Sequence, residues 1–324
     1  MGEGATVLVL APADDGEANQ VTTQLTRRGV AFFRLDTAAF PTSCTVTAEL
    51  GPSGWHGTVT TPEGTLDLGA VEAVLYRQPS PFGLPAGLNP SERRFAQVEA
   101  RFGLGGLLAS LPARWVPGTP GRVADAEYKP LQLAAAVRCG LTPPPTLATN
   151  SPDAARSFTA RHDGGAVYKA FMHKAVADDG SLALIYTSPV DPATVDRRVA
   201  STMHQFQANL AARKRCDVRV LANRHRHAAV AILSTDPHAR QDFRSRYDAL
   251  VYRPVDVPPQ VAEGCRRYLH ALDLRLGVFD FCVTDDDQWY FLECGPGAQW
   301  AWLAEEVGQA MSDLVADALL EELS

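Results

Sequence analysis

The stretch from Gly277 to Trp302 constrains the fold more than any other part of the chain. Residues 278–284 and 289–294 are rich in aromatic and β-branched side chains, and the acidic segment 285–288 separates them. Two such runs joined by a short polar turn are typical of a β-hairpin. Because both faces of this hairpin are apolar, we expect it to be buried.

The register of the hairpin would bring two carboxylates together. With a four-residue turn, Thr284 pairs with Trp289, and Asp280 lies opposite Glu293. Because side chains alternate along a strand, both acids then share one face. In this register the same face also carries Val278, Cys282, Trp289 and Phe291.

Two carboxylates that face each other inside a protein repel, and burying an unpaired charge is costly. A hard cation such as Mg²⁺ removes that cost, because it takes oxygen ligands of this kind, often together with substrate phosphates. The acid pair is therefore either a metal site or two solvated groups on a half-exposed face.

Composition and charge argue against several classes of protein. The 324 residues suffice for two or three domains with their own cores. The net charge of -7 argues against a general nucleic-acid binder, and no apolar run approaches the length of a membrane span. The cysteines form no C-x-x-C pair and no signal peptide is recognised, so we expect reduced thiols in a cytoplasmic protein.

The first 118 residues have the pattern of a small α/β unit. It begins strand–helix–strand, but no G-x-G-x-x-G follows the first strand, which argues against dinucleotide binding. Asn89-Pro90-Ser91-Glu92 predicts a helix start, with Asn at the cap and Glu at the third position. A Pro/Gly-rich connector at 112–120 then predicts a domain boundary. Strands are expected at 6–10, 31–35, 44–50, 55–61 and 71–76.

Lysines are scarce, which makes each one informative; the chain has only Lys129, Lys169, Lys174 and Lys214. Lys129 precedes a proline in a helix expected over about 124–139. A helix break there would place its ammonium near free backbone N–H groups, a combination that favours phosphate, although a surface lysine is the alternative. Lys169 lies on an apolar strand face, so it either reaches the sheet edge or meets an anion. Lys214 is placed in a basic turn.

Arg219 follows Asp217 on a predicted strand, with one residue between them. An Asp-x-Arg pair on a strand either makes a cross-strand salt bridge or leaves the guanidinium to clamp a phosphate. The pattern alone leaves both possibilities open. Two further helices, expected at 258–274 and 303–320, have apolar residues at helical spacing and are assigned to the core.

Several of these motifs together resemble the ATP-grasp ligases. The strand with Asp280, the short turn and the strand running through Glu293 to Gln299-Trp300 are similar to the magnesium hairpin of that family. More narrowly, the chain resembles the ATP-grasp maturases of ribosomally made peptides, the graspetide (microviridin-type) macrocyclases. Other segments that carry the likeness are Tyr76-Arg77-Gln78-Pro79, Ala126-x-x-Lys129-x-x-Gln132-Leu133, Phe206-Gln207 followed by Asp217-x-Arg219-Val220, and Asp242-Phe243-Arg244.

The resemblance implies an α/β (α+β) ATP-grasp fold in three parts. These are a pre-ATP-grasp domain at 1–118, a central subdomain at 119–205 and a C-terminal subdomain at 206–324. Mg²⁺ would be held by Asp280 and Glu293. ATP would contact Lys129, Lys169, Gln207, Asp217 and Arg219, and catalytic roles would fall to Arg219, Lys169 and Arg244. The loop 173–182 would be a lid over the phosphates.

In that family, ATP phosphorylates a carboxylate, and a hydroxyl or amine then attacks the acyl-phosphate. The resemblance therefore implies a ligase that closes ω-ester or ω-amide rings between acidic side chains and Ser, Thr or Lys side chains of a precursor peptide. The central subdomain would hold the leader segment of that peptide. The protein would be a homodimer.

Three positions depart from the family's pattern, among them Gly297, which stands where a polar residue often sits. Gly295 stands where the family has an Asn that helps to hold magnesium, and Ala208 stands where many members have a Glu that holds adenine. These departures favour one alternative, a peptide-binding protein that kept the fold without the activity. A second alternative keeps the ligase and changes the substrate to a small molecule or a free amino acid. A nucleic-acid role for the basic segment 213–226 is weaker, because the protein is acidic.

Overall fold

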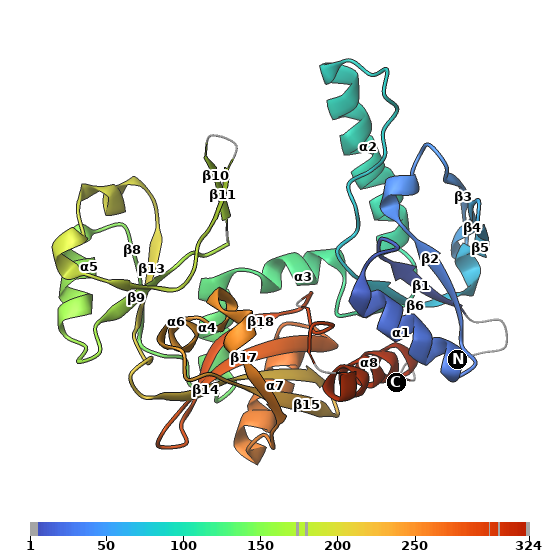
Figure 1. Ribbon diagram of the computed structural model, residues 1–324. Helices are drawn as coiled ribbons and strands as arrows, with labels where there is room; N and C mark the ends of the chain where they lie inside the picture. The colour runs from blue at the N-terminus through green and yellow to red at the C-terminus, as the bar shows by residue number, and fades with distance from the viewer. Residues whose placement is uncertain (1–5, 173–174, 179–180, 298, 304, 322–324) are drawn as a thin grey trace. The chain divides into compact units, whose positions relative to one another are not determined.

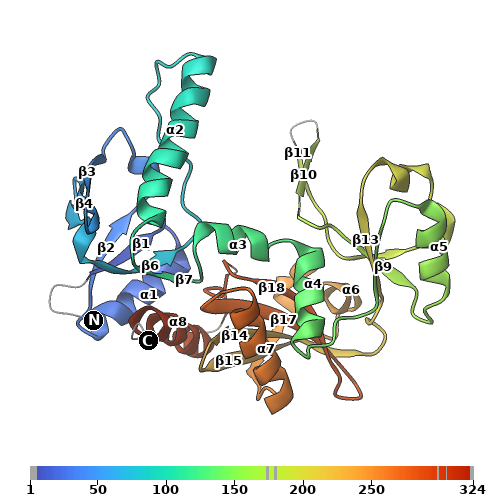
Figure 2. The same ribbon diagram turned by 180° about the vertical axis from the view of Figure 1, so that it is seen from behind.

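A computed structural model describes residues 6–172, 175–178, 181–297, 299–303 and 305–321. The chain divides into two compact units, each built from separate stretches of sequence. Unit 1 comprises Met1–Val123, Asp273–Leu276 and Pro296–Ser324, and unit 2 comprises Ala124–Leu272 and Gly277–Gly295. Both units are mixed α/β structures, as expected (Figures 1 and 2). Within the described ranges, no helix has the length and apolar character needed to cross a membrane.

A parallel four-stranded sheet forms the centre of unit 1, in the order β2-β1-β6-β7. Its strands are β1 (Thr6–Leu10), β2 (Ala31–Leu35), β6 (Val71–Tyr76) and β7 (Arg114–Val116). The first three were predicted, whereas β7 lies in the stretch expected to be a connector. With three residues, all buried, β7 is too short to show an alternating pattern. A second, antiparallel sheet consists of β3 (Thr45–Gly51), β4 (Gly54–Thr61) and β5 (Gly64–Asp67).

Helix ends in unit 1 follow the capping signals of the sequence. Asp15 caps α1 (Gly16–Arg27), and Gly29 takes the left-handed conformation, φ +68°, just beyond its end. Helix α2 (Pro90–Ala109) begins with a complete capping box between Asn89 and Glu92. The last helix, α8 (Glu305–Leu320), lies beside α1 and is joined to the end of that helix by ion pairs from Arg28.

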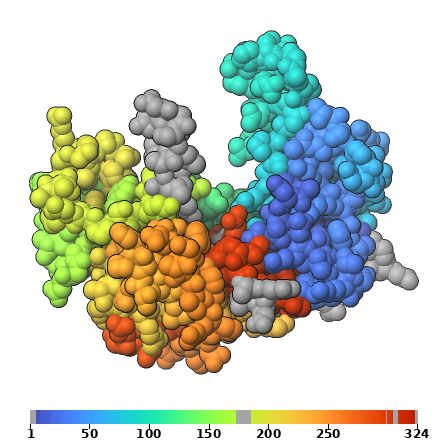
Figure 3. Space-filling model, viewed as in Figure 1, coloured from blue at the N-terminus to red at the C-terminus, as the bar shows by residue number. Residues whose placement is uncertain are grey.

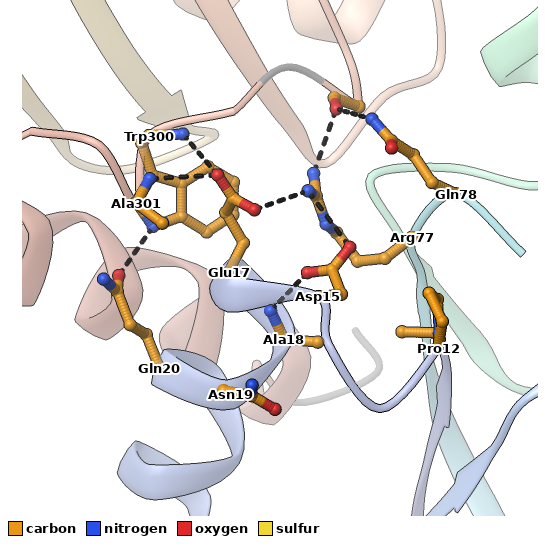
Figure 4. A network of polar contacts seen from close by, with 12 residues as sticks. Pro12, Asp15, Glu17, Ala18, Asn19, Gln20, Arg77, Gln78, Trp300 and Ala301 are labelled. Carbon is orange, nitrogen blue, oxygen red and sulfur yellow. Dashed lines mark hydrogen bonds and ion pairs between the residues drawn. The ribbon is translucent and has the colours of Figure 1, made fainter.

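A buried network of polar contacts ties the segment after residue 296 to α1 (Figure 4). The Arg77 side chain is 2% exposed and pairs with Asp15 at 3.4 Å and Glu17 at 3.2 Å. Glu17 also accepts hydrogen bonds from the backbone N–H groups of Trp300 (2.8 Å) and Ala301 (2.9 Å). The Arg77 guanidinium lies over the Trp300 ring, 5.1 Å from its centroid. Two segments that carry the family resemblance, aromatic-Arg-x-Pro and Gln-Trp, thus meet inside unit 1.

Two larger sheets dominate unit 2, in the orders β12-β9-β13-β8 and β16-β15-β14-β17-β18. The first comprises β8 (Thr146–Thr149), β9 (Ala166–Lys169), β12 (Ser188–Val190) and β13 (His204–Ala208). The second comprises β14 (Lys214–Asn223), β15 (His227–Leu233), β16 (Val251–Pro254), β17 (Leu276–Thr284) and β18 (Trp289–Gly295). A small hairpin is formed by β10 (Ala175–Asp178) and β11 (Ser181–Leu184). The helices of unit 2 are α4 (Lys129–Arg138), α5 (Pro152–Ala160), α6 (Pro237–Gln241) and α7 (Pro259–Ala271), and α3 (Pro120–Ala126) begins in unit 1 and ends in unit 2.

Unit 2 contains the helix break, the expected lid and one of the domain boundaries predicted from the sequence. The helix expected over 124–139 is interrupted, because α3 ends at Ala126 and α4 begins at Lys129, which is the break considered from the proline. Residues 185–187 connect the end of β11 at Leu184 to the start of β12 at Ser188. Residues 173–174 and 179–180 of the expected lid lie outside the described residues. The three-part division of the chain remains a prediction; its boundary at 205 falls within β13.

The hairpin of β17 and β18 contains the predicted acid pair, but its register near the turn differs from the predicted one. Val283, not Thr284, lies opposite Trp289, because the Thr284 N–H donates to the carbonyl of Gln288 within the turn, at 3.1 Å. A β-bulge at Leu292 then shifts the register by one residue. Asp280 and Glu293 are therefore opposite each other, as predicted, but for a reason that the sequence did not reveal.

Because of the same bulge, two residues of β18 lie on the opposite face of the hairpin from the one predicted. Trp289 and Phe291, expected on the face of the acids, lie opposite Val283 and Phe281 on the other face. Tyr268 of α7 packs there against Phe291, with ring centroids 5.6 Å apart. That face is therefore the side of the hairpin that packs into the core.

Candidate active site

One cavity in unit 2 contains most of the residues that the sequence singled out. It encloses about 1090 Å³, its open mouth included, and has walls from both large sheets of the unit. The 3₁₀ helix Phe243–Ser245 and the start of α4 contribute further lining residues. The predicted site residues that line it are Lys129, Lys169, Gln207, Asp217, Arg244, Asp280 and Glu293. Arg219 does not line the cavity but bonds Asp280, which does.

Every lysine that the structure describes lines this cavity, although the protein as a whole is acidic. Lys129 is the first residue of α4, Lys169 the last of β9 and Lys214 the first of β14. Lys174 lies outside the described residues. Three ammonium groups around one hollow favour a ligand with several negative charges.

Each member of the facing acid pair has a basic partner. Arg219 holds Asp280 with two hydrogen bonds of 2.9 Å, so the cross-strand salt bridge is the arrangement that the structure contains. Burial opposes the positive charge of Arg219, but the bonds and charge of Asp280, together with the charge of Glu293, raise the pKa of Arg219 overall. Lys129 donates a hydrogen bond to Glu293. The two carboxylates are thus neither unpaired nor fully solvated.

Lys169 differs from the other lysines of the cavity. Its ammonium makes no hydrogen bond or ion pair with any residue that the structure describes. Burial lowers the pKa of Lys169, and the negative charge of Glu293 opposes that shift only in part. A partly desolvated cation without a direct partner is suited to receive an anionic ligand.

Lys214 was missed as a site residue, because it was placed in a basic surface turn. It begins β14, is only 7% exposed and donates to both carboxylate oxygens of Asp217, at 3.0 and 2.9 Å. Burial raises the pKa of Asp217, while the charge of Lys214 acts in the opposite direction. The scarcity of lysine, together with an acid three residues later, was the available signal for this pair.

The segment Asp242-Phe243-Arg244 places a third carboxylate–cation pair at the cavity. Arg244 donates to Asp242 at 2.8 and 2.7 Å, and the Thr187 N–H donates to the same carboxylate at 3.0 Å. Burial alone would raise the pKa of Asp242, but these bonds lower it overall. The Phe243 ring has the Arg219 and Arg244 guanidinium carbons 5.7 and 5.9 Å from its centroid. The ring therefore helps to fix both arginines.

Backbone and neutral polar groups of β13 and the residues after it form another part of the lining. The Gln207 amide donates to the Thr146 hydroxyl at 3.0 Å, and Gln205 has a buried amide oxygen without a hydrogen-bond partner among the described residues. Ala208 lines the cavity, and its N–H donates to the carbonyl of Pro145 at 2.9 Å. This wall offers amide and apolar contacts in place of a glutamate.

Five basic groups and four acids are gathered in and directly behind the cavity wall. The basic residues are Lys129, Lys169, Lys214, Arg219 and Arg244, and the acidic residues are Asp217, Asp242, Asp280 and Glu293. In the parts of the chain that the structure describes, no group of three His, Cys, Asp or Glu side chains is arranged to hold a metal. Asp280 and Glu293 fit a Mg²⁺ that takes its other ligands from phosphates and water.

Comparisons with known proteins bear on both units. Residues 6–120 match the family described as the MvdD pre-ATP grasp domain. No curated protein matches the sequence. The fold is shared with the macrocyclase MdnC from Microcystis aeruginosa MRC, solved with the precursor peptide MdnA, at a TM-score of 0.82 and 26% identity. That match covers 98% of this chain and 100% of the other.

Two further solved structures have the same fold. The macrocyclase MdnB from Microcystis aeruginosa MRC is 26% identical, with a TM-score of 0.79, over 98% of this chain and 100% of the other. A RiPP-associated ATP-grasp ligase from Chryseobacterium gregarium, solved with ADP and a leader and core peptide, has a TM-score of 0.85 at 23% identity. That match covers 97% of this chain and 96% of the other.

Proposed function

We propose that this chain, which has the ATP-grasp fold and resembles the maturases of ribosomally made peptides, is an ATP-dependent carboxylate ligase. The γ-phosphoryl group passes from ATP to an acidic side chain of a precursor peptide, which gives ADP and an acyl-phosphate. A Ser or Thr hydroxyl or a Lys amine of the same peptide then attacks the acyl carbon and loses its proton. Phosphate leaves, and an ω-ester or ω-amide ring closes.

The observation that carries this proposal is the set of matched charges around one cavity. Its carboxylates are each held by a basic side chain, and Lys169 remains without a direct partner among the described residues. Phosphoryl transfer needs cations around the phosphates more than it needs covalent help from the protein. We assign Lys129 and Lys169 to the nucleotide phosphates, Arg219 and Arg244 to the transferred phosphoryl group, Gln207 and Asp217 to the nucleotide site, and Asp280 and Glu293 to Mg²⁺.

These assignments require Lys129 and Arg219 to exchange their carboxylate partners for phosphate when ATP binds. Lys129 and Arg219 bond and neutralise the two carboxylates that would hold the metal. With ATP and Mg²⁺ bound, both basic groups would turn to phosphate oxygens, and Asp280 and Glu293 would hold the metal. Mg²⁺, when bound, neutralises charge on the phosphates. Because the metal and phosphate sites share these groups, we expect Mg²⁺ to bind with ATP and not alone.

Calorimetry of ATP binding tests the proposal. We expect binding that requires Mg²⁺ and that is at least about tenfold weaker in Glu293→Gln and Lys169→Met, since each change removes a charge from the site. Arg215→Met is the matched control, because this neighbour of Lys214 is exposed and pairs with Asp287 instead. Absence of ATP binding in the parent protein at millimolar Mg²⁺ would reject the ligase assignment.

A second candidate function is peptide binding without catalysis. Gly295 supports it, because the hairpin offers two carboxylates and lacks the family's third metal ligand at that position. ADP release in the presence of an acidic precursor peptide separates the candidates, since a binding protein would retain the peptide without producing ADP. Turnover with free amino acids instead of a peptide would favour a small-molecule ligase.

The same proposal includes a leader peptide, a second copy of the chain and a cytoplasmic location. A leader segment of the precursor would be held by the central part of the chain, and the protein would act as a homodimer. A cytoplasmic location fits the use of ATP and the six cysteines, all of which are buried and free.

A further inference from the structure

One face of α2 exposes large apolar side chains. Phe95 is 69% exposed, Val98 50% and Phe102 72%, whereas the helix buries Ala100, Leu104 and Leu108 on its other side. Spacings of three and four residues place the exposed side chains in one stripe along the helix. We call the stripe of Ser91, Phe95, Val98 and Phe102 the outer face of α2.

The amino-terminal half of α2 has little support from its own unit. No residue of the helix before Ala100 is buried, and these turns project from the sheet of unit 1 (Figures 1 and 3). The capping box of Asn89 and Glu92 stabilises the end of the helix, but most helical stability in proteins comes from packing of an apolar face. A projecting helix with exposed phenylalanines therefore points to a partner.

The charges beside the outer face identify that partner as a second copy of the chain. In a seven-residue repeat, Phe95 and Phe102 occupy position a, and Val98 occupies position d. Arg94 and Arg101 then fall at position g, and Glu92 and Glu99 at position e. The two flanks of the stripe thus carry opposite charges.

This pattern selects one orientation of two helices. In a parallel pair, position g faces position e of the partner, so Arg94 meets the partner's Glu99 and each Glu99 meets the partner's Arg94. In an antiparallel pair, g faces g and e faces e, which would bring like charges together. We propose that the outer faces of α2 from two copies pair in parallel across a twofold axis. The inference names the surface of the proposed homodimer and does not depend on ligase activity.

Charge exchange tests this pairing. Sedimentation velocity of the full chain should show a monomer–dimer equilibrium over micromolar concentrations, since the contact is short. Arg94→Glu and Glu99→Arg should each weaken association about tenfold, because each replaces two attractive pairs with repulsive ones. An equimolar mixture of the two variants restores both pairs and should associate as the parent does. A parent protein that is monomeric throughout, or a mixture that stays monomeric, would overturn the proposal.

Cysteine cross-linking tests the orientation separately. Val98→Cys places identical residues opposite each other in the parallel pair, so oxidation should give a covalent dimer. Gln97→Cys is the matched control, because this exposed neighbour lies off the stripe. The six native cysteines are buried and should not interfere. Equal cross-linking of both variants would contradict the pairing, and circular dichroism checks that these exposed substitutions leave the fold intact.

Discussion

The Arg77 guanidinium lies 5.1 Å from the centroid of the Trp300 ring, and both residues bond the Glu17 carboxylate. Arg77 does so through its side chain and Trp300 through its backbone N–H. The contact joins the parallel sheet of unit 1 to the segment that follows the β17–β18 hairpin in sequence. Arg77 also donates to the carbonyl of Gly297, at 3.0 Å. A single buried cation therefore fixes α1, β6 and the chain after residue 296 within one unit.

Replacing Arg77 should destabilise unit 1 strongly. Arg77→Met would leave the Asp15 and Glu17 carboxylates buried without their cation, at a cost of about 3–5 kcal/mol in the free energy of unfolding. Arg28→Met is the control, because Arg28 is partly exposed and its ion pairs should contribute less than about 1 kcal/mol. Urea unfolding compares the two variants, and equal losses would contradict the importance given to the buried network.

The sequence predicted those features that depend on local signals. Asp15, Asn89 and Gly29 mark helix ends because capping geometry involves only a few neighbouring residues. The facing of Asp280 and Glu293 was also predicted, although it results from a turn and a bulge whose register effects cancel.

What the sequence could not supply depends on tertiary contacts. Lys214 stood in a run of basic residues, and only the packing of β14 shows that its side chain is buried beside Asp217 while that of Arg215 is exposed. The pairing of Arg219 with Asp280 likewise needed the order of the strands. The roles assigned to these residues in binding ATP remain predictions.

The buried Lys214–Asp217 pair should be more costly to break than to replace. Lys214→Met leaves a buried carboxylate without its cation and should lower the free energy of unfolding by about 3–5 kcal/mol. Adding Asp217→Leu should recover most of that loss, because apolar residues can replace a buried pair at little cost. Urea unfolding of the single and double variants measures the effect. A double variant that is less stable than the single one would contradict the claim that apolar residues can replace this pair.

Lys169 should show opposite effects on stability and on ligand binding. Its folded pKa is lowered by burial, so the charged form destabilises the fold; this penalty is full at low pH and fades as pH rises through the folded pKa. Lys169→Met should therefore raise the melting temperature at neutral pH while weakening ATP binding. Thermal unfolding and calorimetry of the same preparation test both parts. A lower melting temperature would indicate that the ammonium is stabilised by its surroundings.

The same lysine predicts a pH dependence of ATP binding. Above the lowered pKa of Lys169 the free protein has lost this proton, and bound phosphate would favour its return. Binding at a pH above that lowered pKa should thus take up a proton, whereas binding at a pH well below it should not involve this group. Calorimetry in buffers of different ionisation enthalpy detects the uptake, and Lys169→Met should abolish it. Identical uptake in the variant would assign the proton to another group.

Gly295 offers a gain-of-function test of the metal site. It ends β18 two residues after Glu293 and lies opposite Val278, while the resembling family has an Asn there. Gly295→Asn would add an amide oxygen, a ligand type that Mg²⁺ accepts. We expect the Mg²⁺ concentration that gives half-maximal ATP binding to fall by about tenfold, the low end of what one supporting group contributes at metal sites. Gly87→Asn, at an exposed position of unit 1 with open space at its Cβ position, is the control for a general effect of asparagine. An unchanged Mg²⁺ requirement in Gly295→Asn would mean that the two carboxylates and the nucleotide already complete the site.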